Sequence, residues 1–165
     1  MRKAESWNTG ASRRVPGDVI LASQGQGVAV MEATFPDDIC GLVRREERGP
    51  GIYVNRARAT TRKRFTVAPE LGHAVLGHLS EDSALTDWDD GLYVFRAVGG
   101  RHDGRAGEAN RFAAALLMPA RLVLGEADRI GGALDTRLLA DRFWVSEAAI
   151  AVRLRDLLPQ LAGTR

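Results

Sequence analysis

Two side chains suited to metal-assisted hydrolysis stand close together in the first half of the chain. Residues 69–73 read Pro-Glu-Leu-Gly-His. A zinc peptidase helix carries two histidines four residues apart, whose imidazoles meet one ion, and a glutamate beside the first histidine that deprotonates the metal-bound water. Glu70 and His73 match the glutamate and the second histidine, whereas Pro69 occupies the position of the first. The motif therefore lacks one metal ligand.

The helix that carries these residues is predicted over residues 61–79, with an apolar stripe through Leu71. At about 100° per residue, His73 lies roughly 200° from Leu71, and we expect it to face a cleft together with Glu70. His78 falls in line with the stripe, about 140° from His73. We therefore predict that His78 is a partly buried structural histidine outside the ligand sphere of His73. A surface histidine beside a surface glutamate is the alternative interpretation of His73 and Glu70.

A second block lies downstream, where an acidic residue opens a helix of small residues able to pack closely on another helix. Residues 108–119 read Glu-Ala-Asn-Arg-Phe-Ala-Ala-Ala-Leu-Leu-Met-Pro, and residues 64–68 read Arg-Phe-Thr-Val-Ala. Together with Val54-Asn55 and a C-terminal element over residues 139–154, these blocks resemble the ImmA/IrrE family of metallopeptidases. The resemblance covers roughly residues 26–158. These blocks, occurring together in the right order, are more specific than any one of them alone.

The resemblance implies a zincin-like fold in which two helix histidines and a downstream glutamate hold Zn²⁺, while the glutamate after the first histidine activates water. By position, His73 matches the second ligand, Glu108 the third ligand and Glu70 the general base. Pro69 marks the degenerate first-ligand position. The family role that follows is cleavage of an XRE-type helix-turn-helix repressor, which switches on mobile-element, phage or stress genes. The expected cofactor is zinc, and the expected partner is such a repressor.

Pro69 departs from the family pattern in two ways. Its ring offers no lone pair to a metal, so His73 and Glu108 remain as two ligands where catalytic zinc sites keep three. It also lacks the amide hydrogen that would bond the carbonyl of Phe65, at a cost of about 3 kcal/mol inside a helix. We therefore expect either a helix that begins near Thr66, with Thr66 as its N-cap, or a kinked helix. We also expect zinc binding and catalysis to be weak or absent.

Few other residues can replace the missing ligand. The chain has three histidines and one cysteine. His102 lies in a glycine-containing loop over residues 99–107 that could bring it into the cleft as a substitute ligand, although a loop histidine is solvated by default. Cys40, being alone, excludes an internal disulfide and two-cysteine zinc motifs.

The pattern of apolar residues predicts an α+β fold, because short strands precede a series of helices. We treat residues 1–18 as a loosely ordered arm and residues 19–165 as a single domain, a size that suits one core. The zincin-like version of this fold has a small, mainly antiparallel sheet packed on the active-site helix, followed by C-terminal helices. The expected strands are 28–31, 39–43, 52–54 and 92–98, a polar loop covers 80–91, and further helices cover 106–118, 137–142 and 147–158, the last with Ser146 as its N-cap.

Composition and charge exclude several classes of protein. The 23 basic and 21 acidic residues give a net charge of +2, which is too balanced to demand nucleic acid as a partner. Acidic residues outnumber basic ones only over residues 66–108. The longest apolar run, residues 112–118, is far shorter than the roughly 18 residues of a membrane-spanning helix. No secretory signal is visible at the N-terminus, so we expect a cytoplasmic protein with no membrane partner.

Three functions are compatible with these observations. The first is an ImmA/IrrE-like zinc metalloendopeptidase, impaired by Pro69, that acts on an XRE-type repressor. The second is a pseudopeptidase that binds and sequesters the repressor without cutting it. The third is a DNA-associated regulator that uses the helix-turn-helix-like segment 137–158. The second helix of that segment is largely apolar and suited to packing on the domain, so direct contact with nucleic acid is not expected.

Overall fold

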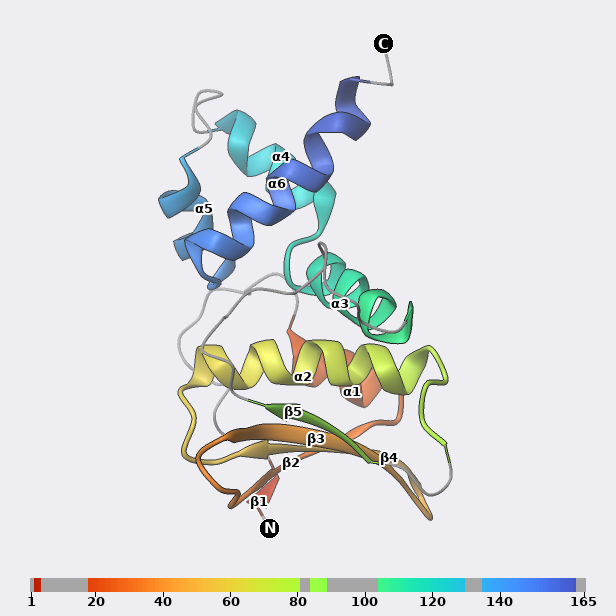
Figure 1. The fold of residues 1–165 in the computed structure, drawn as a ribbon. Coiled ribbons are helices and arrows are strands. Elements are labelled where there is room, and N and C mark those ends of the chain that lie inside the picture. Colours follow the sequence, from red (N-terminus) through yellow and green to blue (C-terminus); the bar gives the residue numbers. More distant parts are fainter. Residues whose placement is uncertain (1, 4–17, 81–83, 89–103, 130–134, 163–165) are drawn as a thin grey trace.

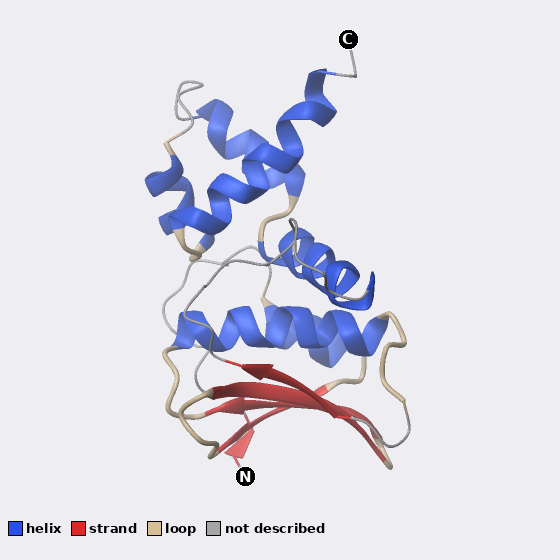
Figure 2. Cartoon of the chain, in the orientation of Figure 1, coloured by secondary structure: helices blue, strands red, loops and turns tan. Residues whose placement is uncertain are grey.

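The computed structural model describes residues 2–3, 18–80, 84–88, 104–129 and 135–162. One sheet forms a layer at one end of the molecule, and the described helices all lie on one side of it (Figures 1 and 2). Helices α1 (Val19–Gly25) and α2 (Thr60–Val75) lie against the sheet, and α3 (Gly104–Leu117) lies over α2. The C-terminal helices form the layer beyond: α4 (Ala120–Arg129), α5 (Thr136–Phe143) and α6 (Glu147–Ala162). None of the described helices has the length and apolarity that crossing a bilayer requires.

The sheet confirms the predicted α+β class and its mainly antiparallel pairing. Its strand order is β1-β2-β4-β3-β5, and only β2 and β4 run parallel among its neighbouring strands. The three predicted strands at 28–31, 39–43 and 52–54 correspond to longer ones. The strands are β1 (Arg2–Lys3), β2 (Ala29–Ala33), β3 (Ile39–Glu46), β4 (Gly49–Asn55) and β5 (Ala84–Trp88).

Strand β5 lies inside the segment for which the sequence predicts a polar loop, so that prediction is wrong. The strand pairs antiparallel with β3, with Leu85 opposite Val43, and Leu85 packs against the hydrophobic core. Pairing with an open sheet edge can impose a strand on a polar segment, since strand formation depends strongly on tertiary context. The predicted strand 92–98 lies outside the described residues.

Helix α2 is the central element, with the sheet on one side and α3 on the other (Figure 1). It starts at Thr60, next to the predicted start at residue 61, so Pro69 lies well inside it and the alternative in which the helix begins near Thr66 is wrong. Thr66 is 1% exposed and belongs to the buried interior of the helix rather than to its N-cap. Burial against two layers can offset the roughly 3 kcal/mol cost of an interior proline.

The C-terminal helices confirm most of the predicted pattern. Helices α5 and α6 match the predicted pair, and the Ser146 side-chain oxygen accepts a hydrogen bond from the Ala149 amide at 3.2 Å, as an N-cap does. Helix α4 is not predicted, because Pro119 was interpreted only as the end of the preceding helix. The Pro119 carbonyl accepts bonds from the Leu122 and Val123 amides, so Pro119 also begins the next helix. A proline at that place fits, because its fixed φ suits a helix start.

The N-terminal part of the chain adds two elements that the sequence does not predict. Asp18 caps α1, its carboxylate accepting from the Ile20 and Leu21 amides at 3.0 and 3.1 Å. Arg2–Lys3 form β1 on the edge of the sheet, paired with Met31 and Glu32. Residues 4–17 of the predicted arm lie outside the described residues.

Candidate functional site

His73, His78 and Glu108 lie together where the end of α2 faces α3. The Nδ1 atoms of His73 and His78 are 3.0 Å apart, and Nε2 of His78 lies 3.1 Å from Oε2 of Glu108. The two imidazole rings stand edge to face, with centroids 5.1 Å apart and an interplanar angle of 68°. The His73 and Glu108 side chains, which the family resemblance names as zinc ligands, therefore each lie within hydrogen-bond distance of the same side chain. They converge on the imidazole of His78, which stands between them.

The predicted placement of His78 is partly right and partly wrong. It is a buried histidine, 8% exposed, with hydrogen-bond partners on both ring nitrogens. It is not remote from His73, because the helical rotation used to separate the two residues does not extend that far. Helix α2 ends at Val75 rather than near Leu79.

A Schellman turn at the end of α2 brings His78 back to His73. Gly77 has φ +73°, a left-handed conformation that glycine adopts without a side-chain clash. The His78 amide donates to the His73 carbonyl at 2.9 Å, and the Gly77 amide reaches the Ala74 carbonyl at 3.4 Å. These are the two backbone bonds that define the motif. A glycine two residues after the last helical position is the sequence signal that could have placed His78 in this site.

Glu70 and Pro69 occupy the turn of α2 that precedes His73. Glu70 is only 5% exposed, which contradicts the alternative interpretation of this residue as a surface glutamate. The sheet and α3 cover α2 on opposite sides, which leaves little of its middle accessible (Figure 1). Pro69 is half-buried. His102, the predicted substitute ligand, lies outside the described residues.

The donor atoms do not fit a three-ligand catalytic zinc centre. Pro69 supplies no donor, and His78 already has each ring nitrogen within hydrogen-bond distance of another side chain. The two nitrogens of one imidazole point in different directions, so His78 cannot offer both to a single ion. Among the described residues, no group of three histidine, cysteine, aspartate or glutamate side chains is arranged to hold a metal. A catalytic zinc ion normally has three protein ligands.

Two buried basic residues on α2 fix the helix to its neighbours. Lys63 Nζ lies 2.6 Å from Oε1 of Glu32 and ties the helix to β2. Arg64 Nη1 donates to the carbonyl of Trp144 at 2.8 Å, which ties the helix to the end of α5. Burial lowers the pKa of Arg64 to about 10, so the guanidinium remains charged at neutral pH. The sequence marks Arg64 only as part of a family motif and does not predict this contact.

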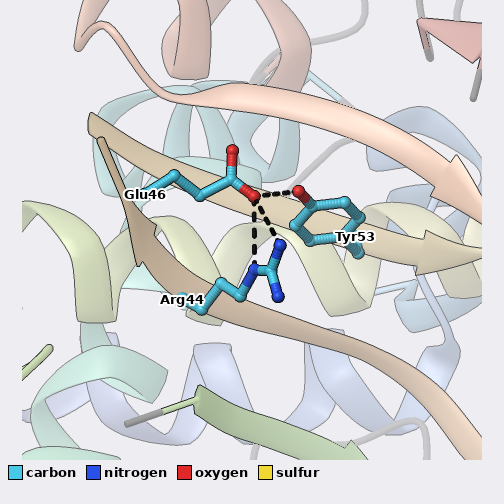
Figure 3. Close-up of polar contacts among 3 residues, drawn as sticks. All are labelled: Arg44, Glu46 and Tyr53. Carbon is cyan, nitrogen blue, oxygen red and sulfur yellow. Dashed lines mark hydrogen bonds and ion pairs between the residues drawn. The ribbon is translucent and has the colours of Figure 1, made fainter. Parts of the chain in front are cut away.

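A further polar cluster joins β3 and β4 on the face of the sheet that points away from the helices (Figure 3). The Tyr53 hydroxyl donates to the Glu46 carboxylate, and Nε and Nη2 of Arg44 donate to the same oxygen at 3.2 and 3.1 Å. The hydrogen bond from Tyr53 is the main cause that lowers the pKa of Glu46. Burial, followed by the bond to Glu46, raises the pKa of Tyr53. These contacts link neighbouring strands and give the cluster a structural role.

Comparison with known proteins decides the family. Residues 24–155 match the peptidase family described as the IrrE N-terminal-like domain. The chain belongs to this family. The match confirms the resemblance inferred from the motif blocks, including the segment that contains Pro69. No curated protein matches the chain.

A solved structure supports the same fold. The Mycobacterium tuberculosis transcriptional regulator superposes with a TM-score of 0.56 over 91% of this chain, with 22% sequence identity. A likeness at that level of identity shows a shared fold and nothing about the chemistry of this chain. The chain spans 44% of the length of that regulator, so the regulator contains much that has no counterpart here.

Proposed function

We propose that this IrrE-like chain is a regulatory protein that binds an XRE-type helix-turn-helix repressor without cleaving it. The observation that carries the proposal is the position of His78 between His73 and Glu108, in a motif where Pro69 replaces the first ligand. Membership of the IrrE-like family supports a regulatory role. A cytoplasmic location follows from such a partner and remains a prediction.

The rival hypothesis is a metalloendopeptidase with reduced activity. It assigns Glu70 as the general base and His73 and Glu108 as the remaining zinc ligands. The donor geometry does not favour it, because two protein ligands separated by a third side chain do not make the three-ligand set that such sites use. The two hypotheses differ in one measurable outcome, which is whether the bound repressor stays intact.

The test uses the purified chain and the short XRE-like repressor encoded beside its gene, if one is present there. Binding is measured by calorimetry, and the mass of the repressor is followed by mass spectrometry with added zinc and with a chelator. We expect a complex that contains intact repressor and that a chelator does not dissociate. Glu70→Gln serves as the matched control, because it keeps the side-chain volume and removes the carboxylate. Cleavage that requires zinc and is lost in Glu70→Gln would establish the peptidase instead, and absence of any complex would refute the binding proposal.

Direct DNA binding by the C-terminal helices is not favoured. The inner face of α6 is buried through Ile150 and Leu154, and Nε of Arg153 donates to the Met118 carbonyl at 3.0 Å. Exposed Arg155 stands next to exposed Asp156, so this part of α6 does not present a uniformly basic surface. A DNA-reading helix is usually basic and exposed. Affinity for duplex DNA that falls steeply with added salt would revive the DNA hypothesis.

A further inference from the structure

We propose that His78 performs the mechanical task of the missing ion, by linking α2 to α3 through hydrogen bonds while its ring occupies the space between His73 and Glu108. This inference goes beyond the proposed function, because it concerns how the site is held together and not which partner it binds. It rests on two distances, 3.0 Å from His78 to His73 and 3.1 Å from His78 to Glu108. It makes the chain's stability independent of metal.

The hydrogen-bond donors and acceptors of the three side chains can pair with one another without a metal ion. A neutral imidazole carries one donor nitrogen and one acceptor nitrogen. His73 can donate from Nδ1 to Nδ1 of His78, and His78 can then donate from Nε2 to the Glu108 carboxylate. Each contact in this sequence joins one donor to one acceptor. The last bond has a charged acceptor, and such bonds are shorter and stronger than neutral ones.

The two ends of the bridge differ in exposure to solvent. The side chain of His78 is 6% exposed, whereas that of Glu108 is 52% exposed. A buried imidazole has few alternative partners in water, so breaking its bonds leaves a polar group unsatisfied. The exposed side of Glu108 gives solvent, and an added metal ion, a route to the bridge.

The backbones of α2 and α3 approach each other closely beside the bridge. A Cβ atom placed on Gly72 would lie 3.0 Å from both Cα and the carbonyl oxygen of Ala109. Ala109 directly follows Glu108, and Gly72 directly precedes His73. The close helix contact and the hydrogen-bonded bridge therefore lie side by side. Restoring a histidine at position 69 would leave this arrangement, and the ring of His78, where they are.

The first experiment measures zinc affinity by competition with a chromogenic chelator. The proteins are the natural chain, His78→Ala, Pro69→His, the double variant Pro69→His/His78→Ala, and the control Pro69→His/Val75→Ala, which truncates an exposed side chain near the same helix end. We expect only the double variant with His78→Ala to bind one zinc ion at least about tenfold more tightly than Pro69→His. Equal affinity of Pro69→His and the double variant would overturn the inference. So would stoichiometric zinc on the natural chain that is lost in His78→Ala, because His78 would then be a ligand.

The second experiment measures the bridge through stability. Urea unfolding of His78→Ala, Glu108→Ala and their double variant gives the coupling between the two residues, which we expect to be about tenfold in the unfolding constant. A chelator should leave the Tm of the natural chain unchanged. Additive effects of the two substitutions, or a Tm that falls on chelation, would overturn the inference. If the alanine variants do not fold, His78→Gln with hydrogen exchange of the α3 amides replaces the cycle, and protection equal to that of the natural chain would be the contrary result.

These outcomes are separate from those of the binding test. If the chain shows the coupling and the blocked zinc site but binds no repressor, the proposed function is refuted and the bridge is supported. If the chain binds intact repressor but shows no coupling, only the bridge is refuted.

Discussion

Arg64→Met tests how α2 holds the C-terminal helices. Arg64 is 1% exposed, and its Nη1 donates to the Trp144 carbonyl at 2.8 Å and lies 3.4 Å from the Phe143 carbonyl. Its guanidinium carbon lies 5.3 Å from the centre of the Trp144 ring. Trp144 has φ 55° and caps the end of α5, so Arg64 supports the residue at which α5 gives way to the turn before α6. Methionine fills a similar volume without donors or charge.

The expected cost follows from these contacts. A hydrogen bond from a charged donor contributes about 1.5–3 kcal/mol. The interaction with the indole ring adds about 0.5–2 kcal/mol, depending on desolvation. Removing a buried charge works in the opposite direction, because desolvation disfavours the guanidinium and lowers its pKa to about 10. We expect a net loss of about 2–3 kcal/mol, which corresponds to a Tm lower by about 4–12 °C in a chain of this length.

The measurement combines urea unfolding with hydrogen exchange. Arg64→Lys is the matched control, since it keeps a positive charge and loses the planar fork that reaches two carbonyls. We expect Arg64→Lys to lie between the natural chain and Arg64→Met. Loss of amide protection should be concentrated in α5 and α6. A change below about 0.5 kcal/mol for Arg64→Met, the range of ordinary surface substitutions, would refute this reasoning. Protection lost equally in the sheet would refute it as well.

Three further substitutions test the packing, the caps and the strand cluster. Gly72→Val should destabilise the chain by about 1–3 kcal/mol in urea, because its side chain has no room beside Ala109, and an unchanged midpoint would contradict the close helix contact. Asp135→Ala should cost about 1 kcal/mol of thermal stability because it removes the N-cap of α5, and a gain in Tm would contradict this. Tyr53 lowers the pKa of Glu46 from its ordinary 4.5, so the stabilisation by Glu46 is present above that value and is lost as pH falls through the folded-state pKa. Urea unfolding from pH 7 to about 3 should therefore show that the natural chain is more stable than Glu46→Gln by about 1 kcal/mol or less at this partly exposed site. We expect this difference in unfolding free energy to shrink as the pH falls, and a constant difference would contradict the assignment.

The sequence predicts best those elements whose signal is local. The strands at 39–43 and 52–54 have short apolar runs bounded by turn residues, and both are confirmed. Helix α4 follows Pro119 without an intervening loop, and a proline is equally compatible with the end of one helix and the start of the next. Strand β5 is a short segment within the mostly polar residues 80–91, and it pairs with the edge of β3. Such an element depends on a partner that is distant along the chain, and local patterns carry no information about it.

The candidate site divides in the same way. The motif blocks place His73 on α2 and Glu108 on α3, and both side chains lie within hydrogen-bond distance of His78. The position of His78 was not predicted, since helical periodicity was extended past Val75, where the helix ends. Gly77 reverses the chain and brings His78 back over the last turn. Predicting the site therefore required the helix end, which a single glycine signals and which the apolar pattern alone conceals.

The two departures from a peptidase site act together. Pro69 provides no ligand for a metal ion at the middle of α2. Without that ligand, an open space between His73 and Glu108 has no metal-binding role. An empty polar space beside a buried helix end would leave those two side chains without a common partner, whereas the ring of His78 gives each of them a hydrogen bond. A chain that needed the ion for its stability would be weakened by Pro69, and a chain bridged by His78 would not be. This difference supports the proposed structural role of His78 between α2 and α3.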